Sequence, residues 1–126
     1  MGARCVEELV CYQLAVELRR TCLAITARTV FSDDRRFRDD FCAAARSAPC
    51  NISEGYRRRS HREFARYLDI ALSSLAEVKN HVGDALENRY VSPQEATDCL
   101  RLLKRTNVAT SRLRDYLLRN PYDRSA

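Results

Sequence analysis

Residue types that favour other structural classes are scarce in this chain. Its 126 residues include no tryptophan, three glycines and three prolines. So few turn-forming residues argue against a fold built from many short strands. With 45% hydrophobic and 31% charged residues, the composition is instead typical of packed helices with solvated outer faces. The length predicts one domain over residues 1–126.

Long apolar runs are also absent. No stretch approaches the roughly 20 apolar residues that are needed to span a bilayer, and the N-terminal residues lack the hydrophobic core of a signal peptide. We therefore expect a cytoplasmic protein with no membrane partner.

Cysteine and histidine do not form a recognisable metal motif. The six cysteines include no C-x-x-C pair, and neither His61 nor His81 is spaced with them like a zinc ligand. The chain also lacks the Glu-x-x-His pairs of di-metal bundles. We expect no metal or cofactor, mostly buried cysteines that act as small apolar residues, and two solvent-facing histidines.

Lysine is nearly missing from the basic residues. Of the 22 basic residues only Lys79 and Lys104 are not arginine, and the net charge is +5. The planar fork of arginine suits phosphate and carboxylate groups, so this bias is compatible with nucleic-acid or acidic protein partners. A GC-rich genome would produce the same bias with no binding role.

Hydrophobic residues recur at helical spacing in four segments. The third segment has the clearest period, with apolar residues three or four positions apart. Short connections between four helices favour an all-α fold, an antiparallel up-and-down four-helix bundle. The expected helices cover approximately residues 6–30, 34–55, 61–89 and 93–119.

Helix starts and stops are signalled locally. Ser32 or Asp33 is expected to cap the second helix, Pro49 to kink it, and Gly55 to end it in a left-handed conformation. Two Ser-x-x-Glu capping boxes, which begin at Ser60 and Ser92, open the third and fourth helices.

Basic residues gather in two places. The first cluster sets five arginines against Glu63, and the second lies in the basic segment 101–124. If both face one way, they would form a phosphate-binding surface, although charge runs are often only solvated faces. The candidate binding residues are Arg57, Arg58, Arg59, Arg62, Arg66, Lys104, Arg105 and Arg112.

A dense ungapped motif covers residues 47–77. Its residues include Ser47, Pro49, Asn51, Ile52, Glu54, Gly55, Arg58, Ser60, Glu63, Phe64, Arg66, Tyr67, Leu68, Ile70, Ala71, Ser74, Leu75 and Glu77. They resemble the pattern S-x-P-x-N-I-A-E-G-x-x-R-x-S-x-x-E-F-x-R-F-L-x-I-A-x-G-S-L-x-E of the four-helix-bundle proteins of the 23S ribosomal RNA intervening-sequence family. Ser53, Tyr67 and Ser73 replace the usual Ala, Phe and Gly.

The resemblance implies an up-and-down bundle that assembles as a ring, typically a homopentamer. Relatives include the accessory protein of diversity-generating retroelements, a basic pentameric barrel that works with a reverse transcriptase and nucleic acid. The motif residues are expected to have structural roles, and the resemblance does not imply catalysis.

Three functional hypotheses follow. The leading one is a non-catalytic, ring-forming bundle that binds RNA or DNA through its two basic clusters. The second is a protein-interaction scaffold or accessory subunit, for example of a reverse transcriptase, whose arginines serve subunit or partner contacts. The third is an enzyme, in which Cys50 would meet a distant histidine or Glu54 would act as a base.

The periodicity of the third helix generates a stability prediction. Truncating Leu68 or Leu75 to alanine should lower the free energy of unfolding by roughly 2 to 5 kcal/mol, because each change leaves a cavity in the core. Thermal or urea unfolding measures the loss, and an unchanged melting temperature would refute the core assignment.

Overall fold

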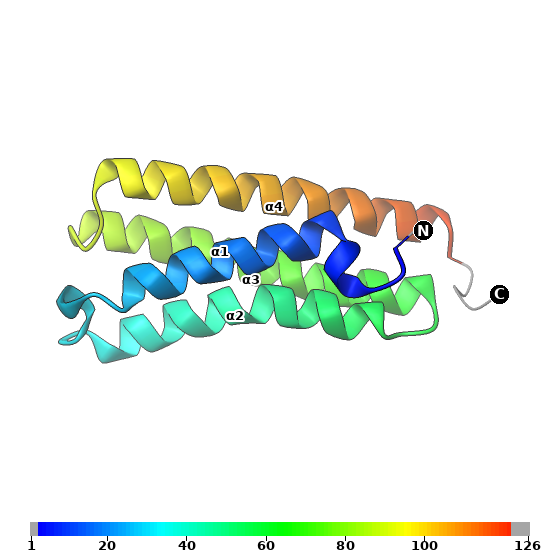
Figure 1. The fold of residues 1–126 in the computed structure, drawn as a ribbon, viewed down its shortest axis with the longest axis horizontal. Helices are drawn as coiled ribbons and strands as arrows, with labels where there is room; N and C mark the ends of the chain where they lie inside the picture. The colour runs from blue at the N-terminus through cyan, green and yellow to red at the C-terminus, as the bar shows by residue number, and fades with distance from the viewer. Residues whose placement is uncertain (1–2, 122–126) are drawn as a thin grey trace.

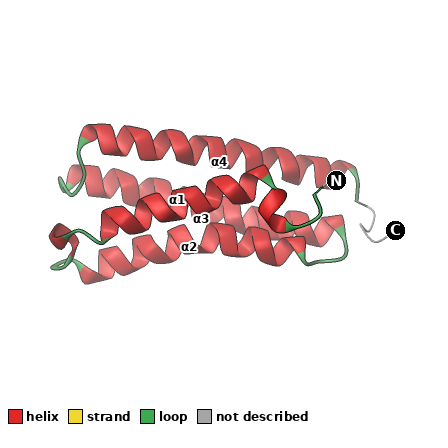
Figure 2. Cartoon of the chain, viewed as in Figure 1, coloured by secondary structure: helices red, strands yellow, loops and turns green. Residues whose placement is uncertain are grey.

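Four long helices make up the computed structural model of this chain, which describes residues 3–121 (Figure 1). Residues 122–126, which include Arg124 of the second basic cluster, lie outside the described residues. Within the described range no β-strand forms (Figure 2), and no helix there is long and apolar enough to cross a membrane. The predicted all-α bundle is confirmed. Its helices are α1 (Val10–Thr26), α2 (Arg35–Tyr56), α3 (His61–Glu87) and α4 (Pro93–Arg119).

The helices pack in the order of the chain. Each contacts its neighbours in sequence and α1 closes on α4, so that α1 and α3 stand at diagonal corners. The centre is filled by large side chains from every part of the bundle. Leu68 and Leu75 are fully buried there, as the sequence predicts. The largest other buried side chains are Leu18, Phe31, Phe41, Ile52, Phe64 and Leu117.

The first helix is shorter than predicted. A 3-10 turn (Val6–Glu8) precedes α1, and a second 3-10 turn (Thr29–Phe31) follows it. The chain is extended at Leu9, which buries its side chain, and therefore the helix cannot begin before Val10. At the other end Phe31 turns inward and contacts Tyr90, with ring centroids 5.0 Å apart.

The predicted cap of α2 is wrong. Asp34 occupies the cap position, and its side chain forms no capping hydrogen bond with the first turn. The Asp34 carboxylate instead accepts a hydrogen bond from the Tyr90 hydroxyl at 2.9 Å, which raises the pKa of Tyr90. The Asp34 side chain thus joins the α1–α2 connection to the α3–α4 connection and does not cap its own helix.

The end of α2 also differs from the prediction. The helix continues through the buried Pro49 to Tyr56, so the bend expected at Pro49 does not interrupt it. Among the described glycines none has a positive φ, so Gly55 is not a left-handed terminator. A Cβ atom at Gly55 would lie 2.6 Å from the Tyr67 Cβ and 2.9 Å from the Phe64 ring. Glycine is needed there because α3 approaches closely.

Hydroxyl and amide groups of the family motif join α2 to α3. The Ser74 hydroxyl donates to the Ser47 hydroxyl across the helix pair at 2.7 Å. The Asn51 amide donates to the Ser47 carbonyl at 2.9 Å and to its hydroxyl at 3.0 Å. These half-buried polar groups satisfy one another, so that small residues can occupy the interface without a desolvation penalty.

The turn between α3 and α4 places Arg89 at φ 61°, a conformation that favours glycine. The Tyr90 amide bonds the Ala85 carbonyl at 2.8 Å, which closes a Schellman motif. The predicted capping box then opens α4, with both bonds between Ser92 and Glu95 present. Arg28 also bonds Glu95, and together with the Ser92 amide it lowers the pKa of that carboxyl to about 2.

The buried face of α4 includes two polar residues. The apolar spacing of the fourth helix predicts Val108 on this face, but Val108 is 38% exposed, whereas Thr106 and Thr110 are fully buried. Each threonine donates its hydroxyl to the carbonyl four residues earlier, at 2.8 and 2.7 Å. Because the hydroxyl is satisfied within its own helix, a threonine can replace an apolar residue in this core.

The two glycines that the structure places inside helices allow a matched test. Gly55→Ala should lower the free energy of unfolding by about 1–3 kcal/mol, because the added Cβ forces α2 away from Tyr67. Gly83→Ala should raise it by about 0.5–1 kcal/mol, because its Cβ meets nothing within 4 Å and alanine favours the helix. Urea unfolding measures both changes, and equal stability of the two variants would contradict the close approach of α3 to α2 at Gly55.

Candidate nucleic-acid interface

The connection between α2 and α3 lies at the end of the bundle that also holds the start of α1 and the end of α4 (Figure 1). The Ser60 hydroxyl starts α3 by accepting a hydrogen bond from the Glu63 amide at 3.1 Å. This is one of the two bonds of the predicted capping box. His61 donates from Nδ1 to the carbonyl oxygen of Asn120, which ties the start of α3 to the end of α4. These two bonds therefore fix the start of α3, which carries part of the first basic cluster.

Arg58 is engaged within the protein. Its Nη2 lies 2.6 Å from the Glu54 carboxylate and 2.8 Å from the Tyr67 hydroxyl. The guanidinium carbon lies 4.8 Å from the centre of the Tyr67 ring, within cation–π range. The position of Glu54 at a helix end predicts a pair with an arginine of a neighbouring element. The partner is instead Arg58, only four residues later in the chain. Much of the charge of Arg58 is thus neutralised locally.

The other arginines of the first cluster are open to solvent. Arg57 and Arg59 flank Arg58 in the connection, and Arg62 and Arg66 lie on the first two turns of α3. All four are exposed, and none forms an ion pair with another described residue. The structure therefore presents four unneutralised guanidinium groups near one end of the bundle.

The second basic cluster lies along the side of the bundle. Lys104, Arg105 and Arg112 line a groove of about 380 Å³ between α1 and α4. The groove contains mainly apolar surface, which is contributed by Val10, Leu14, Val108 and Ala109. The two predicted clusters thus occupy different places, one at the end of the bundle and one beside α1.

Two arginines of the predicted basic segment 101–124 are not among the candidate binding residues. Arg101 lines the same groove, and its spacing of three and four residues from Lys104 and Arg105 could have revealed it. Arg114 bonds Asp69 of α3 at 3.0 Å and its neighbour Asp115, so it links two helices. The two carboxylates raise the pKa of Arg114, and they balance its charge at the surface of the bundle.

Cysteine chemistry has no support in the arrangement. Cys50 is exposed on α2, and among the described residues no hydrogen bond joins it to a histidine. Burial raises the pKa of the Cys11 thiol to about 11. A hydrogen bond with Cys99 and burial also raise the pKa of Cys22. These thiols stay protonated at neutral pH, where a thiolate would be needed for attack.

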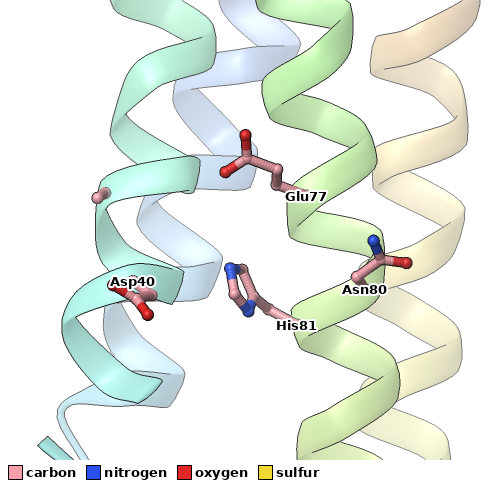
Figure 3. A pocket seen from close by; sticks show the side chains of 5 residues that line it. Asp40, Glu77, Asn80 and His81 are labelled. Atoms are coloured by element: carbon pink, nitrogen blue, oxygen red, sulfur yellow. The ribbon is translucent and has the colours of Figure 1, made fainter. Parts of the chain in front are cut away.

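Both histidines are less exposed than predicted. His61 is 8% exposed, and His81 packs against Phe37 and Phe41 with ring centroids 5.6 and 5.5 Å away. The Nδ1 of His81 is buried, and no described residue forms a hydrogen bond with it. Its ring lines a pocket of about 320 Å³ between α2 and α3, together with Asp40 and other residues (Figure 3). The full lining is Asp40, Ala43, Glu77, Asn80 and His81.

Comparison with known proteins assigns the chain to a family. The sequence model described as 23S rRNA-intervening sequence protein matches residues 7–111. This chain belongs to that family. The family match includes both α2 and α3, and therefore the whole motif that joins them. A search among curated proteins finds no match.

A solved structure shares the fold of this family member. It is a protein of unknown function from the S23 ribosomal protein family of Bacteroides thetaiotaomicron VPI-5482. The TM-score is 0.73 at 15% sequence identity, over 82% of this chain and 98% of the other. At this identity the likeness supports the bundle fold alone.

The unequal environments of the three adjacent arginines can be tested by alanine substitution. Arg58→Ala should lower the free energy of unfolding by about 1–2 kcal/mol, since it removes the bonds to Glu54 and Tyr67. Arg57→Ala and Arg59→Ala are matched controls that should change it by less than about 0.5 kcal/mol. Chemical unfolding gives all three values, and equal losses at the three positions would rule out a special role for Arg58.

Proposed function

We propose that this chain is a non-catalytic cytoplasmic protein that assembles as a ring of identical subunits, a homopentamer, and binds RNA or DNA. The observation that carries nucleic-acid binding is the group of four exposed arginines near one end of the bundle. Nearby Arg58 and Arg114 each form an ion pair with a carboxylate, whereas these four form none with the described residues. The binding residues are Arg57, Arg59, Arg62 and Arg66.

Assembly would multiply the charge available to a polyanion. Five copies of a chain of net charge +5 carry about 25 positive charges, and contacts to phosphates then release bound counterions. A ring repeats the same arginines at regular intervals, so one nucleic-acid chain can contact several subunits. Phosphate contacts of this kind position a nucleic acid without reading its sequence.

A binding titration over a salt series tests this proposal. The double variant Arg57→Gln/Arg59→Gln should weaken binding to RNA or DNA. It should also reduce the magnitude of the slope of log K against log salt by up to about 1.8 for duplex or about 1.4 for single strands. Fluorescence anisotropy with labelled oligonucleotides measures both quantities.

The matched control removes the same charge at the opposite end of α2. Arg35→Gln/Arg36→Gln also replaces two adjacent exposed arginines, and it should leave the affinity and the slope nearly unchanged. If the unaltered protein shows no affinity even at low salt, or if both double variants lose affinity equally, the proposal is wrong.

A second candidate is a protein-interaction scaffold or accessory subunit, for example of a reverse transcriptase. The groove between α1 and α4 favours it, because apolar floors with a charged rim are suited to protein contacts. Under this alternative, loss of charge at Lys104 and Arg105 disrupts a protein assembly and leaves nucleic-acid affinity unchanged.

A further inference from the structure

Two grooves lie on opposite sides of the bundle. One runs between α1 and α4, and the other runs between α2 and α3. Figure 1 shows α1 in front of α3, with α4 above and α2 below, so the side between α1 and α4 differs from the side between α2 and α3. Two different sides of one subunit can meet the complementary sides of two neighbours, which is a head-to-tail contact. Such a contact forms a ring when the rotation between copies closes and an open filament when it does not.

The groove between α1 and α4 combines apolar and positive surface. Val10 is 61% exposed and Val108 is 38% exposed, although both are large aliphatic residues. Basic side chains surround this apolar surface. Among the described residues only one of these side chains, Arg101, forms an ion pair, and its partner is Asp98. The basic residues are Arg101, Lys104, Arg105 and Arg112.

The groove between α2 and α3 has the opposite charge. Figure 3 shows Asp40 on α2 and both Glu77 and His81 on α3, and all three line this pocket. Neither carboxylate pairs with a cation among the described residues. Ile70 lies two turns before Glu77 on the same side of α3 and is 41% exposed. This groove therefore offers carboxylates beside an aliphatic side chain.

The complementary residues lie at matching heights. The end of α3 and the start of α4 are joined by a short turn, so both can be measured from one end of the bundle. At about 1.5 Å per residue, Lys104 lies roughly 16 Å and Val108 roughly 22 Å along α4. Glu77 lies roughly 15 Å and Ile70 roughly 26 Å along α3. Rotation about an axis parallel to the helices preserves these heights, so each pair can meet.

We infer that the groove between α1 and α4 of one copy packs on the groove between α2 and α3 of the next. The Lys104 ammonium group enters the pocket between Asp40 and Glu77 of the neighbour, and Val108 covers its Ile70. The contact is heterologous, because different surfaces meet, and in the proposed ring it repeats around the rotation axis. The inference rests on the proposed function only for the statement that the chain self-associates.

This contact assigns separate roles to the two basic clusters. The basic residues of α4 are used between subunits, and the arginines near the connection of α2 and α3 stay available for nucleic acid. Association can therefore be measured without nucleic acid, and a negative result in the oligonucleotide titration leaves this inference standing.

Charge reversal tests the contact in the full chain. Lys104→Glu and Glu77→Lys should each raise the protein concentration at half-assembly by at least tenfold, because like charges then meet across the contact. The double variant Lys104→Glu/Glu77→Lys should return it to within about threefold of the original value, since opposite charges meet again. Multi-angle light scattering and sedimentation velocity measure the assembly over a dilution series.

Controls at exposed positions outside both grooves separate this contact from a general charge effect. Lys79→Glu uses the only other lysine, and Asp33→Lys uses an exposed carboxylate of the connection between α1 and α2. Both should assemble like the original protein, and circular dichroism confirms folding of each variant. Three results would overturn the inference: a chain that is monomeric at every concentration, single reversals that assemble normally, or a double variant that is no better than the single ones.

Discussion

The close packing of α2 on α3 is the constraint on which the rest of the structure depends. At Gly55 the two helices approach so closely that a methyl group would overlap the Tyr67 side chain. Further along, the Ser47 and Ser74 hydroxyls join the same pair. Contacts at two levels fix both the separation and the register of the helices. Larger side chains in this interface would push α2 and α3 apart, and the short connection between the two helices would have to move.

This packing sorts neighbouring arginines into different roles. With α2 and α3 this close, Glu54 and Tyr67 converge on the guanidinium of Arg58. The tyrosine hydroxyl in this bond is itself a departure from the phenylalanine expected in the family pattern. Arg57 and Arg59 have no such partner among the described residues and remain exposed. The packing of α2 on α3 therefore decides which arginine forms an ion pair and which arginines remain unpaired at the surface.

Charge is distributed unevenly around the bundle. Carboxylates flank His81 on one side, whereas Lys104 and other basic residues border an apolar groove on the opposite side. Such a bundle has two different faces, and a contact between unlike faces requires no twofold symmetry. The arrangement arises because α1 and α3 stand at diagonal corners, a relation that depends on the order of packing of all four helices.

The sequence by itself determined the four helices, the start of α4 and the core face of α3. These depend on periodicity and on local bonds such as the capping box at Ser92, which involve residues a few positions apart. Only the tertiary structure decided why glycine is needed at position 55, that Glu54 and Tyr67 bond Arg58, and that His81 packs against Phe41. Each of these depends on which side chains of separate segments meet, and that follows from the packing of whole helices rather than from local preference.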